Sequence, residues 1–173
     1  MNGKTLPDGS RDFDFLMGEW RIRNRKRKNY WTDEAEWEEF EASMAAHPLP
    51  GGIGNYDSFE SPGWRPGFTG MSLRVYSPVT RLWSIYWLSN RDGGLDPQTG
   101  SLLPPVVGSF IDGVGIFEGD DELEGHAIRV RYTWTQSGPG SASWQQAFSR
   151  DGGQSWATNW RMDMQRVKAA VEV

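Results

Sequence analysis

Residues Ser149–Val167 read SRDGGQSWATNWRMDMQRV, a glycine-containing turn followed by a run of alternating side chains. In an extended strand, every second side chain lies on the same face. One face of this run would carry Trp156, Thr158, Trp160, Met162, Met164 and Arg166, and the other Ala157, Asn159, Arg161, Asp163 and Gln165. An apolar face opposite a polar face is typical of a half-buried antiparallel strand. We therefore expect the first face to point into the core of a β-sheet protein.

The turn before this strand, SRDGGQSW at 149–156, resembles the Asp-box of sialidase-like propellers. Propellers repeat the motif from blade to blade, whereas here the full pattern occurs once, in a chain too short for several blades. Asp151 can accept hydrogen bonds from backbone N–H groups of the turn, and Trp156 can pack beneath it. We interpret the motif as a structural turn.

Composition extends the β prediction to the whole chain. The 173 residues include 21 Gly and 10 Pro, which interrupt every periodic run and exclude long helices. About ten short alternating runs are joined by turns, a pattern typical of a sandwich or an up-and-down barrel. We favour a single all-β, antiparallel up-and-down barrel of about ten strands, because sequential hairpins close it without leaving an edge.

The expected limits are a flexible N-terminal arm at residues 1–11, a barrel domain at 12–168 and a tail at 169–173. Phe13, Leu16 and Met17 have helical spacing, so a short helical turn should precede the first strand. A hairpin around Trp31 would then pair Ile22 with Phe40, Trp20 with Ala42, Arg23 with Glu39 and Arg21 with Glu41. The two Arg–Glu pairs indicate that these arginines lie on a solvated outer face and do not form a phosphate-binding patch. We expect a later turn at Gly119–Glu122.

Two features resemble the lipocalin, or calycin, pattern. Gly18-Glu19-Trp20 follows the helical turn, and Arg166 ends the last strand. In that pattern, an arginine from the end of the barrel covers the tryptophan of a Gly-x-Trp on the first strand. A guanidinium stacked on an indole stabilises by roughly 0.5–2 kcal/mol. The resemblance therefore implies that Trp20 and Arg166 close one end of the barrel.

Longer motifs make the resemblance more specific. They are DFLMGEW at 14–20, GMSLRVYSP at 70–78, WSIYW at 83–87, DGVGIFEGDD at 112–121, WQQAFSRDGGQSW at 144–156 and NWRMDM at 159–164. Together they resemble a small family of uncharacterised bacterial proteins in the lipocalin-like superfamily, over residues 12–167. The resemblance implies a calycin-like barrel, and it implies no established activity, ligand or catalytic residue.

Charge and cysteine content exclude several classes of function. A net charge of -5 argues against non-specific binding of nucleic acid, which needs a basic surface. The chain has no Cys, so a disulfide framework and thiolate chemistry are excluded. No run is apolar enough for a signal peptide or a membrane span. We expect a cytoplasmic protein with no membrane partner.

Catalytic, cofactor and metal motifs are missing from the sequence. Neither His47 nor His126 belongs to a recognised Ser-His-carboxylate motif, so we predict no catalytic residue. Haem would need an inward-pointing axial histidine, and no motif indicates this for His126, so we expect no cofactor. An acidic cluster, made of Asp112, Glu118, Asp120, Asp121 and Glu122, lacks the spacing of an EF-hand loop. We expect turn chemistry there and no metal.

The inward aromatic residues are the candidate ligand site. We expect a pocket lined by Trp83, Trp87, Tyr132, Trp134, Trp144, Gln146 and Trp160, with the loop Asn90–Ser101 as its lid. The predicted function is a carrier or sensor of a small apolar or aromatic molecule. Two alternatives stay open. One is a hydrolase or isomerase with cavity carboxylates such as Glu118, and the other is a homodimeric interaction module with a filled core, which uses the two-sided apolar strand Arg81–Ser89.

Overall fold

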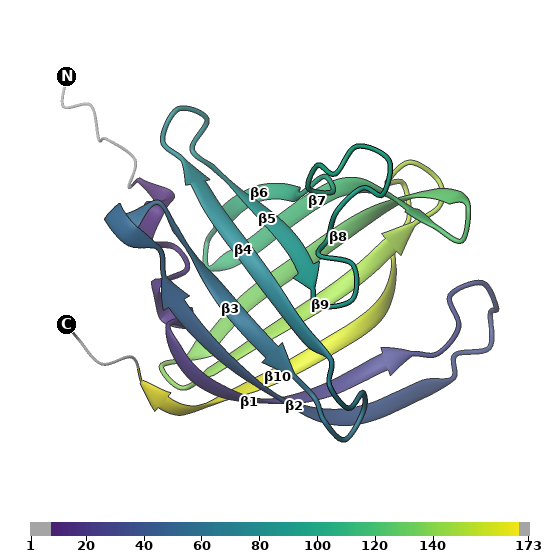
Figure 1. Ribbon diagram of the computed structural model, residues 1–173, viewed down its shortest axis with the longest axis horizontal. Helices are drawn as coiled ribbons and strands as arrows, with labels where there is room; N and C mark the ends of the chain where they lie inside the picture. Colours follow the sequence, from purple (N-terminus) through teal and green to yellow (C-terminus); the bar gives the residue numbers. More distant parts are fainter. Residues whose placement is uncertain (1–7, 170–173) are drawn as a thin grey trace.

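The computed structural model describes residues 8–169, which form one closed barrel of ten antiparallel strands (Figure 1). The strands are β1 (Gly18–Arg27), β2 (Trp37–Pro48), β3 (Gly54–Glu60), β4 (Thr69–Ser77), β5 (Leu82–Ser89), β6 (Val106–Ile111), β7 (Val114–Leu123), β8 (His126–Gly138), β9 (Ser141–Ser149) and β10 (Ala157–Ala169). Two 3-10 turns, η1 (Gly9–Arg11) and η2 (Asp14–Leu16), precede β1, and η3 (Pro50–Gly52) follows β2. Residues 1–7 of the expected arm and 170–173 of the expected tail lie outside the described residues.

Each strand pairs with the next one along the chain, and β10 returns to pair with β1. The predicted up-and-down barrel and its N-terminal helical turn are confirmed. Burial alternates along the strands: in β1, every second residue from Gly18 to Asn24 is buried, and the residues between them are exposed. One face of the strand therefore points into the barrel and the other points to solvent. Because a closed barrel pairs both sides of every strand, it leaves no edge open to another chain.

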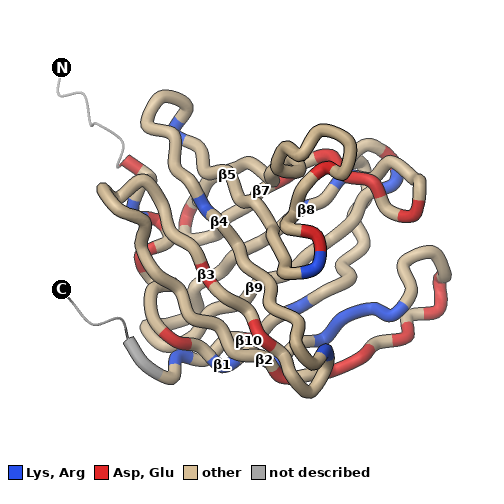
Figure 2. Tube along the Cα trace, in the orientation of Figure 1, with Lys and Arg blue, Asp and Glu red and all other residues tan. Residues whose placement is uncertain are grey.

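The β1–β2 hairpin forms, but its expected register is wrong. The paired residues are centred on Thr32 instead of Trp31, so Ile22 lies opposite Ala42. The other expected pairs shift in the same way: Trp20 lies opposite Met44, Arg21 opposite Ser43 and Arg23 opposite Glu41. A shift of one position in the centre moves each partner by two residues and leaves the faces unchanged. Basic residues of β1 therefore still lie beside acidic residues of β2 (Figure 2).

The turn expected at Gly119–Glu122 is wrong, because β7 continues to Leu123. The chain reverses at Glu124 and Gly125, which have φ of 51° and 79°. Two consecutive residues with positive φ form a tight two-residue hairpin turn, whose twist matches the twist of the two strands it joins. The acidic residues before this turn belong to a strand and pair with β8.

The last strand follows the predicted alternation only after its start. A bulge between Thr158 and Trp160 turns Asn159 into the core, where it is 2% exposed. Trp156 precedes the strand and lies on the outer surface, where the guanidinium carbon of Arg131 is 3.9 Å from its ring centroid. The expected faces of Asn159 and Trp156 are therefore wrong, because a bulge adds one residue and changes which side chains point inward.

The N-terminal turns close one end of the barrel and form what we call the plug, residues 9–17. Leu16 is fully buried, and its carbonyl accepts a hydrogen bond of 2.7 Å from Nε1 of Trp20. The guanidinium carbon of Arg166 lies 4.3 Å from the Trp20 ring centroid, and the same group donates to the carbonyls of Met17 and Phe15. The plug and the end of β10 lie at the same end of the barrel (Figure 1).

Candidate ligand-binding cavity

A cavity of about 100 Å³ lies inside the barrel, beyond the plug. Six of the seven side chains predicted for the pocket line it: Trp87, Tyr132, Trp134, Trp144, Gln146 and Trp160. They come from β5, β8, β9 and β10, because each occupies an inward position of its strand. The interior is therefore neither empty nor completely filled by tryptophan rings.

Trp83, the seventh predicted residue, is not among the residues that line this cavity. It points inward from β5 as expected, but it lies at the plug, where its Nε1 donates to the carbonyl of Gly9 at 2.9 Å. Its ring meets the edge of Phe13 at a centroid distance of 5.0 Å. Alternation shows on which face of a strand a side chain lies, but not where along the barrel axis it lies. The sequence therefore could not show that Trp83 lies at the plug and Trp87 in the cavity wall.

The aromatic rings of the wall meet edge to face. Trp144 is T-shaped against both Tyr132 and Trp160, at centroid distances of 5.0 and 5.7 Å. The indole Nε1 of Trp160 donates to Oδ1 of Asn24 at 3.0 Å. Edge-to-face contacts of this kind stabilise the aromatic side chains of the wall.

A buried ion pair also lines the cavity, and the sequence analysis missed it. Nη2 of Arg74 lies 2.5 Å from Oδ2 of Asp57, and the two side chains are only 1% and 2% exposed. Nη1 of Arg74 donates to Asn55 Oδ1 at 3.0 Å, and Asp57 accepts from the backbone N–H of Ser72 at 3.2 Å. The available signal was alternation, because both charged residues share the inward positions of their strands with buried aromatic residues.

Burial raises the pKa of Tyr132 to about 12. Desolvation is the larger cause, and the negative charge of Asp121 adds to it. Each makes the phenolate less favourable, because a buried anion loses hydration and a nearby anion repels it. The Tyr132 hydroxyl is therefore a neutral donor or acceptor in the cavity wall.

An adjoining pocket of about 200 Å³ shares Ile85, Trp87, Tyr132 and Gln146 with the cavity. Its outer wall includes Leu103 and Pro104, from the segment before β6, together with Asp120 and Asp121 of β7. Trp87 stands in the wall of both spaces and is 39% exposed. The two spaces therefore meet at these four side chains.

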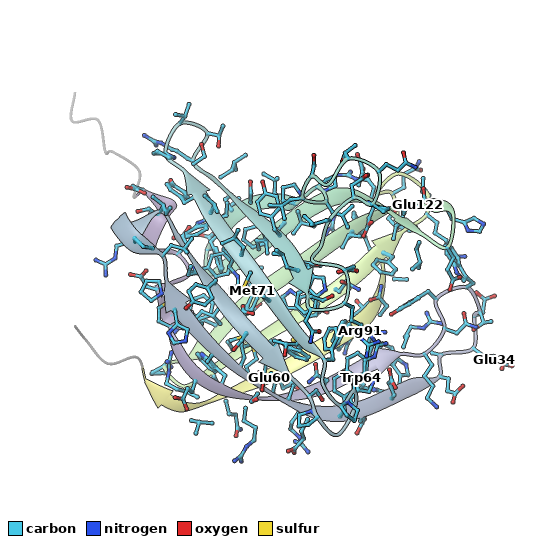
Figure 3. All side chains as sticks on the ribbon, in the orientation of Figure 1. Glu34, Glu60, Trp64, Met71, Arg91 and Glu122 are labelled. Carbon is cyan, nitrogen blue, oxygen red and sulfur yellow. The ribbon has the colours of Figure 1, made fainter. Side chains whose placement is uncertain are left out.

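The loop Asn90–Ser101, expected to be a lid, lies at the end of the barrel opposite the plug. Asn90 holds it to the loop after β3, donating to the carbonyl of Gly67 at 2.8 Å and accepting from the backbone of Thr69 at 3.1 Å. Figure 3 labels Arg91 in this loop and Trp64 in the loop after β3. None of the residues from 90 to 101 is among those that line the cavity or the adjoining pocket. The nearest loop residues, Leu103 and Pro104, follow the predicted range.

A second segment crosses the same end. The β1–β2 connection carries Trp31, whose Nε1 donates to the carboxylate of Glu124 in the β7–β8 turn. The ring of Trp31 also lies 4.8 Å from the ring of His126, and the guanidinium carbon of Arg150 is 5.3 Å from it. His126 is thus exposed at the rim. This connection links opposite sides of the barrel end.

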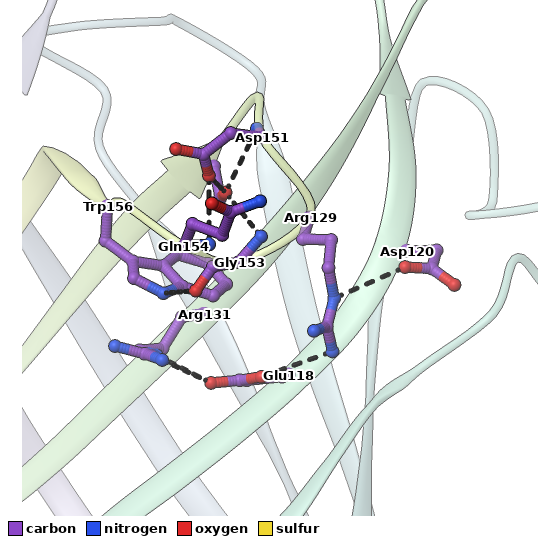
Figure 4. Close-up of polar contacts among 9 residues, drawn as sticks. Glu118, Asp120, Arg129, Arg131, Asp151, Gly153, Gln154 and Trp156 are labelled. Carbon is purple, nitrogen blue, oxygen red and sulfur yellow. Dashed lines mark hydrogen bonds and ion pairs between the residues drawn. The ribbon is translucent and has the colours of Figure 1, made fainter.

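Glu118 and Asp120 take part in a charge network on the outer face of the barrel (Figure 4). Glu118 lies 2.6 Å from Arg131 and 3.2 Å from Arg129, and Asp120 lies 3.4 Å from Arg129. The cavity carboxylate proposed at Glu118 is therefore on the outer face. Among residues 8–169, no group of three or more His, Cys, Asp or Glu side chains is arranged to hold a metal ion.

The Asp-box turn beside this network is organised by Asp151 (Figure 4). Its carboxylate accepts from the hydroxyls of Ser155 and Ser149 and from the backbone of Gln154 and Ser155. These hydrogen bonds lower the pKa of Asp151, the Ser155 hydroxyl contributing most. All of these hydrogen bonds come from residues of the same turn, which agrees with our interpretation of the motif as a structural turn.

No protein-family model matches the sequence, and no curated protein matches it. Among solved structures, the fold is similar to the S-type phycobiliprotein lyase CPES from Guillardia theta, with a TM-score of 0.57 and 12% identity over 91% of this chain and 92% of that one. It is also similar to a protein of unknown function from the DUF3598 family of Nostoc punctiforme, with a TM-score of 0.53 and 13% identity. That match covers 90% of this chain and 49% of the other.

At these identities, the likeness shows a shared calycin-like fold and nothing of the activity. Within the described part of the chain, no helix has the length and apolar character needed to cross a membrane.

Proposed function

We propose that this protein is a carrier or sensor that binds a small apolar or aromatic molecule inside its barrel. The observation that carries the proposal is the cavity of about 100 Å³, lined by four tryptophans and a tyrosine within a closed sheet. Ligand pockets are typically concave and mostly apolar, with a few placed polar groups. Membership of a small uncharacterised bacterial family, a cytoplasmic location and the absence of a bound cofactor are part of the same proposal.

The size of the cavity limits the ligand. An engineered cavity of about 150 Å³ holds benzene, so the 100 Å³ space alone is too small for a complete aromatic ring. The adjoining pocket of about 200 Å³ begins at the same Trp87 wall. We therefore propose a ligand of one or two rings that enters past Trp87 and occupies both spaces.

The similarity to a phycobiliprotein lyase supports a ligand-binding barrel in general terms. A shared fold at 12% identity carries neither the lyase activity nor its substrate to this chain. The enzyme alternative has less support within the cavity itself, because the carboxylate that lines it, Asp57, already binds Arg74 and the backbone N–H of Ser72.

The homodimer alternative was expected at the strand Arg81–Ser89, and exposed apolar residues on the two strands that follow it in the sheet also favour it. Val107, Ile111 and Ile116 on the outer face of β6 and β7 are 37%, 72% and 46% exposed. Sedimentation equilibrium over a range of protein concentrations separates this candidate from a monomeric carrier. Dimer formation is compatible with a ligand in the interior.

Replacing Trp160 with alanine should weaken binding of indane, a neutral two-ring hydrocarbon, at least tenfold. The substitution removes a wall of the cavity and the hydrogen bond to Asn24. It should also lower the free energy of unfolding by about 3 kcal/mol, the lower end for a large aromatic core residue, since Trp160 is only partly buried. Isothermal titration calorimetry and urea denaturation measure the two effects.

The matched control is Trp156→Ala, because Trp156 lies outside the barrel with its Nε1 bonded to the Gly153 carbonyl. It should bind indane as the unmodified protein does. Failure of the unmodified protein to bind indane would contradict the proposed function, and unchanged unfolding of Trp160→Ala would contradict its place in the wall.

A further inference from the structure

Asp121 lies on the inward face of β7, unlike the other acidic residues of that strand. Residues 117, 119, 121 and 123 share one face, because side chains alternate along a strand. On this face Phe117 is fully buried and Leu123 packs against the core. Asp121 is exposed between them and is one of the residues that line the adjoining pocket. An inward position of the barrel therefore carries a carboxylate that borders a pocket.

The carboxylate of Asp121 has no cationic partner within residues 8–169. The nearby guanidinium of Arg129 is engaged elsewhere, since it lies 3.2 Å from Glu118 and 3.4 Å from Asp120. Oδ1 of Asp121 accepts a hydrogen bond of 2.8 Å from the backbone N–H of Glu122. The negative charge of Asp121 is thus left to act on the pocket.

The charges that face the two joined spaces are unequal. The adjoining pocket of about 200 Å³ is lined by two charged residues, Asp120 and Asp121, and both are acidic. Among residues 8–169, Arg74 is the one cationic side chain that lines either space, and Asp57 lies 2.5 Å from it. Because the positive charge of the cavity is balanced and the charge of the pocket is not, the combined space favours a cation over an anion.

The uncharged side chains shared by the two spaces suit a cation as well. Trp87 and Tyr132 are aromatic, and the faces of such rings attract ammonium groups. The negative charge of Asp121 contributes to the raised pKa of Tyr132, about 12, so Asp121 acts electrostatically on the Tyr132 hydroxyl. Gln146 donates through Nε2 to Asn159 Oδ1 at 2.9 Å, which leaves its carbonyl oxygen as an acceptor.

We infer that the aromatic ligand carries a protonated amine, which lies in the adjoining pocket with Asp121 as its counter-ion while the aromatic part occupies the cavity. The inference rests on the proposed function, since it names the chemical class of the molecule that the same site takes. An ammonium group can only donate hydrogen bonds, and the Asp121 carboxylate and the Tyr132 hydroxyl can accept them.

Three probes with the same ring system test this charge preference: 2-aminoindane is a cation at neutral pH, indane is uncharged, and indane-2-carboxylate is an anion. Calorimetric titration at low salt should give a dissociation constant for 2-aminoindane about fivefold lower than for indane. This ratio corresponds to about 1 kcal/mol, the upper end for an exposed ion pair. The carboxylate should bind more weakly than indane, because Asp121 repels it.

Salt gives a readout that a purely structural role of Asp121 would not change. In 1 M NaCl, where charges are screened beyond about 3 Å, the ratio between the affinities for 2-aminoindane and indane should fall toward one. The two probes share their apolar surface, so the effect of salt on apolar burial cancels in the ratio.

The variant Asp121→Asn removes the charge and keeps an oxygen that can accept from the backbone of Glu122. Its affinity ratio at low salt should fall toward one, with binding of indane unchanged. Glu122→Gln is the matched control, since Glu122 is the next residue of the strand, is exposed and lines neither space. This control should keep the ratio of the unmodified protein.

The outcomes separate the inference from the proposed function. If indane does not bind, the proposed function fails and the inference fails with it. If indane binds and 2-aminoindane binds no more tightly, the inference is overturned while the proposed function stands. A preference for the amine that persists in full in Asp121→Asn would also overturn the inference, because Asp121 would then not be the counter-ion.

Discussion

Asp57→Ala should lower the free energy of unfolding by about 3–5 kcal/mol. The substitution leaves Arg74, 1% exposed, without the carboxylate that lies 2.5 Å from it. An unpaired buried charge is among the most destabilising defects in a protein core, because it keeps its desolvation cost and loses its partner. Equilibrium denaturation in urea measures the change.

A surface pair provides the control for this prediction. Glu39 is 78% exposed and lies 3.8 Å from Arg25, so Glu39→Ala should change stability by about 0–1 kcal/mol. The double replacement Asp57→Leu with Arg74→Met should recover much of the loss, because apolar residues of similar volume can replace a buried ion pair. Equal losses for Asp57→Ala and Glu39→Ala would refute the burial of this pair.

Phe13→Ala should cost a similar amount, about 3–5 kcal/mol. Phe13 is 1% exposed and lies at the centre of the plug, with the rings of Trp83 and Phe110 each at 5.0 Å and that of Trp134 at 5.7 Å. Its removal leaves a void where the plug meets the cavity wall. The loss combines the transfer free energy of the ring with the cost of that void.

Phe15→Ala is the matched comparison for the plug. Phe15 is the same residue type, two positions later, but it is only partly buried against the core. It should therefore cost clearly less than Phe13→Ala when both are measured by urea denaturation. If the two variants lose the same stability, the plug is not anchored at Phe13.

Much of the fold could be predicted from alternation, because a period of two gives the face of each side chain. The alternating run within Ser149–Val167 lies in β10, and the expected number of about ten strands is confirmed. The register of the β1–β2 hairpin could not be predicted. A hairpin centred on Trp31, as expected, and one centred on Thr32, as observed, bury the same face of each strand. A bulge at Asn159 has no comparable sequence signal, as a single extra residue can sit at several positions.

The candidate site was predicted only in its aromatic part. Alternation placed residues such as Trp144 and Trp160 on the inner face, and both line the cavity. Alternation could not give the position of Trp83 along the barrel axis, which is beside the plug. Arg74 and Asp57 were overlooked because charged residues are rarely buried without a partner, and their partnership appears only when β3 and β4 pair.

Native mass spectrometry of the protein purified from its own host tests the central claim most directly. The cavity predicts a mass shift from one co-purifying compound, which denaturation should release. Its chemical identification should show a small apolar or aromatic molecule of one or two rings. A population that carries only the mass of the chain, in protein that also fails to bind indane, would contradict a ligand-binding barrel.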